Sequence, residues 1–464
     1  MSLANTEKTS TGRSSHSNVP PGPRSLNPLS STLAFKRTPL SFLTAMSQRY
    51  GDIWQFRLLK WPTVVLNHPN YLKYILQEKY QLYDKNVHFF DTVRLVGGNG
   101  LVTNNDGAHW LRQRRLIQPT FHKQRLAGFA TTMVDMTLES LQRWEAMSRK
   151  GQPISIMEEM HQLVLRIICE TMFSTDIGGQ TSVIGHAWND INTFLNDYYH
   201  MPFPPLSVPT PRNSRFRNAL GSLNAVVDDL IRLRHESNEE RGDILSMLLH
   251  ARDEQTGESM SDQQLHDEVL TLLIGGSDTT VSSLTWIWYM LHQHPEVEWS
   301  LHEELDRVLG GRTPTVNDLP QLSYTRMVID EVLRLYTPAW LFMRRAVQND
   351  EIEGYHLPKG IFVLVSPYAL HRHPGIWEKP EQFRPERFLP EQAERRPRFS
   401  YLPFGGGPRI CIGNNFALME MTLVVATLAQ RYHMELLPEQ GVEPMPLITL
   451  RPNKEILVYL RPRR

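Results

Sequence analysis

The sequence contains little cysteine: Cys169 and Cys411 are the only two in 464 residues. So few thiols exclude a fold that is held together by many disulfides. If Cys411 is a ligand, no disulfide exists at all, which suits a reducing compartment, and we expect a cytoplasmic protein. Cys169 lies in an apolar helical pattern from Leu163 to Phe173, so we expect it to pack as an ordinary core residue.

The sequence also lacks a long apolar run and a net charge. No run approaches the roughly 20 residues that span a bilayer, so we expect no transmembrane anchor. Lys and Arg together number 49, as do Asp and Glu, which argues against general nucleic-acid binding. The first residues are rich in Ser, Thr and Asn without the apolar core of a signal peptide, so residues 1–19 are expected to be disordered.

One ten-residue stretch organises the rest of the chain. It runs from Phe404 to Gly413, places three glycines and a proline before Cys411, and is followed by a helical pattern from Asn414 to about Tyr432. Glycine permits close approaches that a side chain forbids, so Cys411 is expected on a tight loop that opens into a helix. A helix N-terminus favours a thiolate, which is a ligand or a nucleophile. The alternative is a small buried core residue.

The spacing Phe-x-x-Gly-x-Arg-x-Cys-x-Gly resembles the haem-binding loop of the cytochrome P-450 monooxygenases. The resemblance implies that Cys411 is the axial thiolate of the iron of haem b, a ligation that favours O–O cleavage. It also implies that Phe404 shields the sulfur and that Arg409 pairs with a haem propionate. The fold implied is mainly α with a small β region, the cytochrome P-450 fold, in which residues 20–464 form a single haem domain.

Two further motifs match propionate-binding positions of that family. Trp110 and Arg114 are spaced i, i+4 in a helical pattern over Gly107–Pro119, and the family has a similar Trp-x-x-x-Arg that contacts a propionate. The alternative is a solvated basic helix. Arg345, five residues before an aspartate, matches another propionate-binding arginine, although Arg344 beside it leaves that assignment open.

A helix of more than thirty residues is predicted from a capping box at Ser261-Asp262-Gln263-Gln264 to His294, where Pro295 stops it. Its middle reads Gly275-Gly276-Ser277-Asp278-Thr279, and a threonine hydroxyl there can bond back to the carbonyl four residues earlier. The family has a similar break over the haem. The resemblance implies that Asp278 relays protons for O2 cleavage and that Thr279 positions the water chain. The alternative is a helix–helix contact that uses small residues.

Glu331 and Arg334 are spaced i, i+3 on a predicted helix from Ser323 to Leu335, and Pro385-Glu386-Arg387-Phe388 follows downstream. Alone, such a pair is common on solvated helix faces. Together these residues resemble the Glu-x-x-Arg and Arg triad of the same family. We therefore expect Glu331, Arg334 and Arg387 to serve folding and haem seating rather than chemistry.

The pattern around these motifs gives the remaining frame. Strands are expected at Ile53–Leu59, Thr63–Asn67, Ile361–Val365 and Glu455–Leu460, and Tyr83–Val102 is expected to be a long connection. The segment Asp197–Pro205 is either a lid or a surface loop. The resemblance places an apolar and aromatic substrate pocket at Phe89, Phe90, Tyr198, Trp340, Phe342, Met343 and Leu447.

The sequence thus predicts a bacterial-looking monooxygenase that inserts one atom of O2 into an apolar molecule such as a fatty acid, terpenoid or polyketide. No flavin or iron–sulfur module is recognisable, so a separate ferredoxin or flavodoxin-type reductase system is expected to supply electrons. A basic cluster at Arg112, Arg115, Lys123 and Arg125 is the expected docking face. Two alternatives are a peroxide-using haem-thiolate enzyme, which would not need Asp278 and Thr279, and a non-catalytic haem sensor, which would need no lid.

Overall fold

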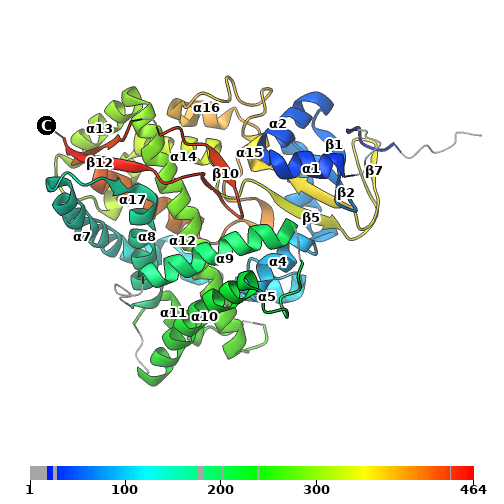
Figure 1. The fold of residues 1–464 in the computed structure, drawn as a ribbon, viewed down its shortest axis with the longest axis horizontal. Helices are drawn as coiled ribbons and strands as arrows, with labels where there is room; N and C mark the ends of the chain where they lie inside the picture. Colours follow the sequence, from blue (N-terminus) through cyan, green and yellow to red (C-terminus); the bar gives the residue numbers. More distant parts are fainter. Residues whose placement is uncertain are drawn as a thin grey trace, which may run out of the picture.

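The computed structural model describes residues 18–23, 29–175, 181–200, 203–237, 241–253, 255–438 and 440–463. Within them, helices fill most of the molecule, and the largest sheet lies at one side of it (Figure 1). Residues 1–17 of the predicted disordered segment lie outside the described residues. Among the described helices, none is both long and apolar enough to cross a bilayer.

The longest described helix, α12 (Asp262–Gln293), has 32 residues and runs through the middle of the fold (Figure 1). It begins as predicted, because the Ser261 hydroxyl accepts from the N–H of Gln264 while the Gln264 side chain accepts from the N–H of Ser261. Pro295 starts the next helix, α13 (Pro295–Leu309). The capping pair satisfies backbone donors that a helix start otherwise leaves without partners.

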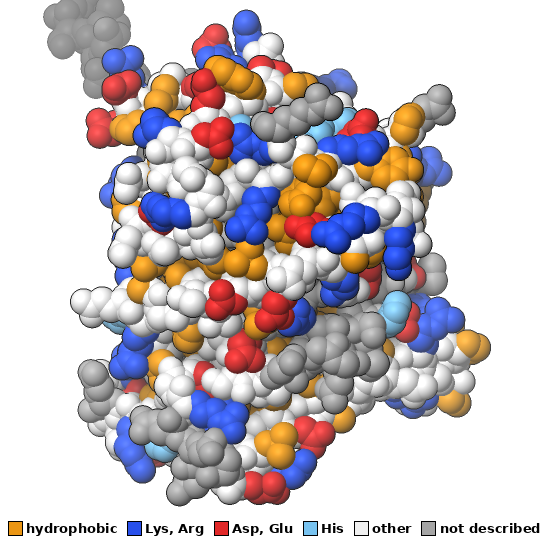
Figure 2. All heavy atoms as spheres, turned by 90° about the vertical axis from the view of Figure 1, so that its left-hand side faces the viewer, with side chains coloured by type: hydrophobic (Ala, Val, Ile, Leu, Met, Phe, Trp, Pro, Cys, Tyr) orange, Lys and Arg blue, Asp and Glu red, His pale blue; other side chains and the backbone are white. Residues whose placement is uncertain are grey.

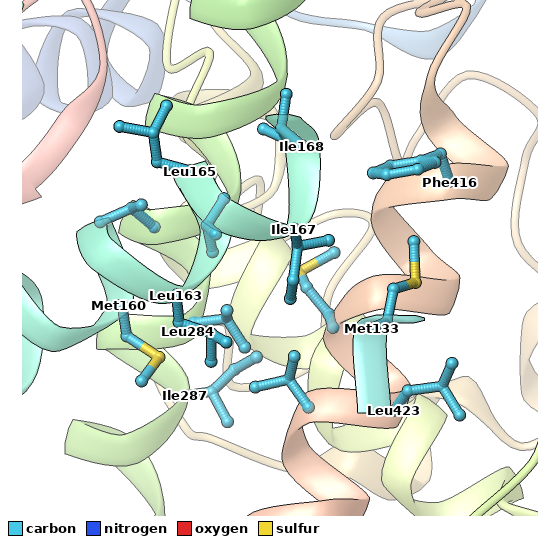
Figure 3. Packing of buried hydrophobic residues seen from close by; sticks show 14 of the residues in the cluster. Met133, Met160, Leu163, Leu165, Ile167, Ile168, Leu284, Ile287, Phe416 and Leu423 are labelled. Atoms are coloured by element: carbon cyan, nitrogen blue, oxygen red, sulfur yellow. The ribbon is translucent and has the colours of Figure 1, made fainter. Parts of the chain in front are cut away.

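The main hydrophobic core lies where α12 meets α7 (Ala130–Arg149), α8 (Ile156–Phe173) and α17 (Asn414–Ala429). Figure 3 shows side chains of these helices interdigitating, among them Met133, Ile167, Leu284 and Leu423, all with no exposed surface. Burying each such side chain contributes about 1.5–3 kcal/mol. The helix that carries the Asp-Thr sequence is therefore held rigidly from several sides.

The five-stranded sheet has the order β1-β2-β8-β5-β3. Its strands are β1 (Ile53–Leu58), β2 (Trp61–Leu66), β8 (Phe362–Val365), β5 (Phe342–Ala346) and β3 (Tyr83–Asp84). β2 and β8 are parallel, whereas the other pairs are antiparallel. All four residues of β8 are buried, as suits a central strand.

The described residues also form three smaller sheets: the β10–β11 hairpin (Pro444–Pro446, Leu450–Pro452), β4-β12-β9 (Ile154–Ser155, Leu457–Pro462, Tyr432–Leu436) and β6–β7 (Asp350–Ile352, Tyr355–Leu357). The β10–β11 hairpin docks on α12. The carbonyl of Leu450 accepts from the Ser282 hydroxyl at 2.5 Å and from the Trp286 indole at 3.4 Å. This contact brings the C-terminal part of the chain to the middle of α12.

The other described α-helices are α1 (Ser30–Arg37), α2 (Pro39–Tyr50), α3 (Pro69–Lys73), α4 (His88–Gly97), α5 (Gly107–Ile117), α6 (Lys123–Leu126), α9 (Thr181–His200), α10 (Pro211–Ser237), α11 (Ile244–His250), α14 (Ser323–Leu335), α15 (Pro367–Leu370) and α16 (Pro390–Glu394). A π-helical turn, Tyr74–Glu78, follows α3.

The predicted bounds of α14 agree with the structure, and the predicted strands are displaced by one to two residues at most of their ends. On the face that Figure 2 shows, positive and negative side chains are interspersed.

The prediction of one long connection from Tyr83 to Val102 is wrong, because this segment contains β3 and helix α4. Phe89, Val93 and Val96 recur at helical spacing, and the helix ends at Gly98, whose φ of +50° suits glycine. A Cβ at Gly98 would lie 2.3 Å from the carboxylate of Asp267 on α12. The end of α4 is thus fitted closely against the long helix.

Candidate active site

The cysteine loop is closed by a hydrogen bond from the N–H of Cys411 to the carbonyl of Phe404, at 2.9 Å. Gly407 lies where this loop crosses the π-helical turn after α3. Its φ is +68°, and a Cβ there would lie 1.8 Å from the carbonyl oxygen of Leu76. Only glycine fits both the backbone angle and the contact. The loop therefore takes the tight form that its glycines predict, and α17 begins at Asn414, directly after it.

The Cys411 side chain is accessible although it lies deep among protein atoms. Burial raises the pKa of the thiol, while the backbone N–H of Gly413 and the Arg114 guanidinium act to lower it. A thiol with a raised pKa is a poor nucleophile by itself. A bound metal ion deprotonates such a thiol outright, so the surroundings of Cys411 fit a ligand better than an unassisted nucleophile.

Two side chains of α5 join that helix to the cysteine loop. The guanidinium carbon of Arg409 lies 4.3 Å from the centre of the Trp110 ring, and Arg409 also donates to the carbonyl of Asn104 at 3.2 Å. Arg114 donates to the carbonyl of Ile410 at 2.7 Å. The structure thus brings together four of the predicted cofactor residues, Trp110, Arg114, Arg409 and Cys411.

Beside this loop, positive charges are gathered in a buried place. Lys85 and Arg344 are 9% and 7% exposed. Burial, followed by repulsion from Arg344 and Arg409, holds the pKa of Lys85 well below its ordinary value. Burial and Arg409 lower the pKa of Arg344 to about 9, and burial lowers that of Arg409 to about 10. Among the described residues, Asp84 is the carboxylate that acts on both arginines.

Lys85 donates to the carbonyl of Val102 at 2.9 Å and lies over the ring of Phe90, but neither contact supplies a negative charge. The excess of buried cations is therefore costly, because buried charges need charged partners. The two propionates of a haem would supply two negative charges at this place. An accessible thiol next to an under-compensated set of cations therefore fits haem, and Lys85 joins the candidate contacts. Sequence reasoning missed Lys85, because no local pattern distinguishes it from a surface lysine.

The structure distinguishes Arg344 from Arg345, between which the sequence left the propionate-binding assignment open. Arg345 forms an ion pair with Asp84, with its Nη2 atom 2.6 Å from Oδ2, and its side chain is 33% exposed. Arg344 is buried near Lys85 and Arg409. A propionate contact of Arg345 stays a prediction, and Arg344 is the arginine that lacks a partner carboxylate at hydrogen-bond distance in the described residues.

The expected break in the long helix is absent, because α12 stays α-helical through Gly275 and Gly276. This part of α12 has two distinct sides. The Thr279 hydroxyl donates to the carbonyl of Gly275 at 2.8 Å, as its spacing predicts, and Gly275 is exposed. Gly276 faces α8, where a Cβ would lie 3.1 Å from Ile168. The contact between small residues and a neighbouring helix therefore explains Gly276, whereas it does not explain Thr279.

Asp278 is 2% exposed and points to the β10–β11 hairpin. Its Oδ2 atom accepts from the Thr449 hydroxyl at 2.5 Å, and its Oδ1 atom forms an ion pair with Arg451. A carboxylate buried in this way requires such partners. The sequence did not reveal either of them.

The predicted triad is assembled and buried. Arg334 holds Glu331 with two hydrogen bonds of 2.7 and 2.8 Å, and the Nε atom of Arg387 lies 3.1 Å from the same carboxylate. Arg334 also donates to the carbonyls of His371 and Pro380 at 2.7 Å. These contacts connect α14 to the chain that precedes the cysteine loop, which is what a role in folding requires.

The predicted pocket residues fall into two groups. Phe90, Trp340 and Met343 belong to one buried cluster, against which Phe89 packs, and the Trp340 indole donates to the carbonyl of Leu447 at 2.8 Å. A cleft of about 200 Å³ reaches this group and is lined by Phe35, Trp61, Val87, Phe89, Met343 and Phe362, among others.

Phe342 and Tyr198 lie elsewhere. Phe342 neighbours Met343 on β5 and therefore points to the opposite face, where it packs against a different cluster and under Arg344. Tyr198 stacks on Phe194 of α9 with 5.2 Å between ring centres, and Arg212 of α10 lies over both rings. Asp197–His200 form the last turn of α9, while residues 201 and 202 of the predicted lid lie outside the described residues.

The comparisons with known proteins agree with this geometry. The sequence profile of the cytochrome P450 family matches residues 20–459. This chain belongs to the cytochrome P450 family. The resemblance stated from the cysteine loop, the mainly α fold, the monooxygenase class and haem b as the cofactor are thereby confirmed.

Three curated relatives come from Streptomyces. Cyclooctatin synthase of Streptomyces melanosporofaciens is 39% identical over 90% of both chains. Cyclooctat-9-en-7-ol 5-monooxygenase of the same organism is 38% identical over 90% of this chain and 89% of its own. Pentalenene oxygenase of Streptomyces avermitilis is 35% identical over 92% of this chain and 94% of its own.

Proposed function

We propose that this P450 monooxygenase oxidises an apolar, cyclic terpenoid. The observation that carries the proposal is the apolar cluster of Phe89, Phe90, Trp340 and Met343, whose aromatic and aliphatic side chains suit a hydrocarbon skeleton. The names of two relatives denote compounds of this chemical kind: cyclooctat-9-en-7-ol is a cyclic alkenol and pentalenene a hydrocarbon. These features favour a terpenoid over a fatty acid or a polyketide.

The residues of α12 fit the delivery of protons. Haem b, when bound, supplies the iron at which O2 is activated. The Thr279 hydroxyl, which is held at the carbonyl of Gly275, can orient a water molecule, and Asp278 can carry a proton. A peroxide-using enzyme would need neither group, so this pair supports the use of O2.

An electron donor of ferredoxin or flavodoxin type stays a proposal, and the structure changes its expected docking residues. Arg115 forms an ion pair with Asp253 at 2.8 Å, and Arg112 lies 3.5 Å from Glu258. Acidic side chains therefore compensate Arg112 and Arg115, two of the four residues of the predicted basic cluster. The remaining two, Lys123 and Arg125, are exposed, and they are the better candidates for contact with an acidic donor.

The test is a substrate panel with the haem-loaded enzyme. It contains a bicyclic terpene hydrocarbon, a cyclic terpene alcohol, a long-chain fatty acid and a macrolide lactone, and the change in the haem absorption spectrum on binding is titrated. Each compound is then turned over with a ferredoxin and its reductase under ¹⁸O2. We expect a spectral shift and a singly ¹⁸O-labelled product from a terpenoid. Turnover of the fatty acid or lactone alone would contradict the proposal.

The pocket assignment has its own control. Trp340→Ala and Met343→Ala should weaken binding of the compound that wild type accepts, because each removes apolar surface from the cluster. Phe342→Ala, on the opposite face of β5, should leave binding nearly unchanged. Equal losses in all three variants would mean that the cluster is a general core rather than a pocket.

A further inference from the structure

Both oxygens of the Asp278 carboxylate are held by the β10–β11 hairpin and not by α12 itself. Thr449 donates to one oxygen, and Arg451 forms an ion pair with the other. Arg451 is 6% exposed, and its Nε atom also lies 3.3 Å from the Thr449 hydroxyl. The side chains of Asp278, Thr449 and Arg451 thus form one buried polar unit, in which each side chain contacts the other two.

Among the described residues, His161 of α8 is a further titratable group that senses the charge of Arg451. Burial, followed by the charge of Arg451, lowers the pKa of His161 to about 4, so this imidazole is neutral at neutral pH. Burial lowers the pKa of Arg451 to about 10, which leaves the guanidinium charged at neutral pH. Arg451 is therefore the cation that compensates the carboxylate of Asp278.

The same hairpin contacts Trp340, a residue of the predicted substrate pocket. The carbonyl of Leu447, in the turn between β10 and β11, accepts from the Trp340 indole. The carbonyl of Leu450 accepts from Ser282 on α12. Thr449 lies in the same turn as Leu447, and Arg451 lies two residues further on in β11. The turn that contacts Trp340 thus carries one of the two side chains that hold Asp278.

We propose that Arg451, together with Thr449, is a positioning residue for proton delivery: the pair fixes the carboxylate of Asp278 and thereby couples the pocket-lining hairpin to the supply of protons. The inference rests on the proposed role of Asp278 in this monooxygenase. Proton transfer through Asp278 then requires the carboxylate to loosen its contacts with the hairpin. Substrate contact with the turn is what promotes that loosening.

Loss of Arg451 has a defined electrostatic consequence. A nearby cation favours the charged form of a carboxylate, so its removal moves protonation of that carboxylate to higher pH. A buried carboxylate without a partner takes up a proton instead of staying charged. Replacement of Arg451 should therefore change the pH dependence of turnover, and it should do so only when Asp278 is present.

The experiment uses the haem-loaded enzyme with its accepted terpenoid and compares Arg451→Gln with wild type. The rate of product formation is measured against pH, in H2O and D2O. We expect the midpoint of the pH profile to move upward by about one unit or more in Arg451→Gln, with a changed solvent isotope effect. Arg451→Lys should retain most of the wild-type profile. In an Asp278→Asn background, Arg451→Gln should no longer move the midpoint.

Ser282→Ala is the matched control, because Ser282 anchors the same hairpin through Leu450 without touching Asp278. It should leave the pH midpoint in place. If Arg451→Gln does not fold, Thr449→Val, which removes one contact of the carboxylate, should give a smaller upward shift. An unmoved midpoint, or an equal shift in the Asp278→Asn background or in Ser282→Ala, would overturn the proposal.

Thermal unfolding separates this inference from the proposed function. In the haem-loaded protein without substrate, the single variants Asp278→Asn and Arg451→Gln and their double variant form a cycle. We expect the double variant to lose much less thermal stability than the sum of the singles. Additive losses would refute the ion pair even if terpenoid turnover is found. A coupled cycle in an enzyme that rejects every terpenoid would support the pair and refute only the substrate class.

Discussion

Arg409 of the cysteine loop lies over the ring of Trp110 in α5, with 4.3 Å between its guanidinium carbon and the ring centre. Such a stacked contact between a partly desolvated cation and tryptophan is worth about 1–2 kcal/mol. It couples the loop that carries Cys411 to the helix that carries Arg114. A cofactor bound to the thiol is therefore seated against a preformed frame.

Replacement of Cys411 tests the ligand directly. The reduced wild-type protein should bind CO with the red-shifted absorption band that thiolate ligation gives, and Cys411→Ser should lose it. Cys169→Ser is the matched control, because this buried core cysteine on α8 should leave the band unchanged. If the band persists in Cys411→Ser, the assignment is wrong.

Breaking the buried triad should cost stability. Arg387→Met leaves Glu331 with one ionic partner fewer, and such a loss inside a protein costs about 3–5 kcal/mol. We expect a lower unfolding temperature and faster release of haem. As control, Arg461→Met breaks the ion pair with Glu435, in which the two side chains are 56% and 45% exposed, and should cost less than about 1 kcal/mol. Similar losses in both variants would contradict a special role for the triad.

Thr279→Ala should separate electron use from product formation. Haem and substrate binding should remain, because the Thr279 hydroxyl bonds within α12 to the carbonyl of Gly275 and its loss leaves the helix in place. Proton delivery should become disordered, so NAD(P)H consumption continues while product per NAD(P)H falls several-fold. Thr285→Ala is the control, since Thr285 makes the same bond to the carbonyl four residues earlier on α12. A wild-type ratio in Thr279→Ala would identify Thr279 as a packing residue.

Glu268 gives a prediction for stability against pH. Burial raises the pKa of Glu268 from its ordinary value of 4.5 to about 8. Between these values the unfolded chain loses the proton and the folded chain keeps it, so stability falls as pH rises. Glu268→Gln should remove this fall and gain on the order of 2–4 kcal/mol at pH 8.

Chemical denaturation at pH 5 and pH 8 measures the effect, with Asp267→Asn as control. Burial raises the pKa of Asp267, but the nearby His266, together with hydrogen bonds from the N–H of Asn99 and the side chain of Gln263, outweighs burial and lowers the pKa. The neighbouring carboxylate therefore stabilises the fold at pH 8, and its replacement should not increase stability. A Glu268→Gln variant with the wild-type pH dependence would show that Glu268 is ionised in the folded protein.

Electron transfer should depend on Lys123 and Arg125. Lys123→Glu combined with Arg125→Glu should raise the Kd for an acidic ferredoxin, with a smaller effect at high salt, because exposed charges act mainly on association. Arg112→Glu combined with Arg115→Glu should instead loosen the contact with residues 253–258. Unchanged donor affinity in the first double variant would exclude this face.

The parts of the site that could be predicted from the sequence have local signals. The capping box at Ser261, the bond from Thr279 to Gly275 and the pairing of Glu331 with Arg334 all lie within four residues, where helix geometry alone sets the contact. The glycines of the cysteine loop are similar, because backbone conformation is a local property.

The partners of Asp278 and Arg345 could not be predicted in this way. Thr449 lies 171 residues from Asp278, and Asp84 lies 261 residues from Arg345. Which side chains meet across such a sequence separation depends on strand register and on how the β10–β11 hairpin docks on α12. A slip of one residue in the register would turn the side chains of the strand to the opposite face of the sheet. Helix α4 is a different case, because the spacing of Phe89, Val93 and Val96 already contained its signal.

The crossing of Gly407 over Leu76 has a practical consequence for laboratory evolution of this enzyme. In a library with all twenty amino acids at position 407, glycine should be recovered almost alone, whatever substrate is used for selection. Any other residue would place its Cβ 1.8 Å from the backbone carbonyl oxygen of Leu76, and no rotamer change relieves a clash with backbone. Randomisation is more useful at Trp340 and Met343, which belong to the predicted pocket. Variants at position 407 should instead misfold, so their frequency in the library measures the background of misfolded clones.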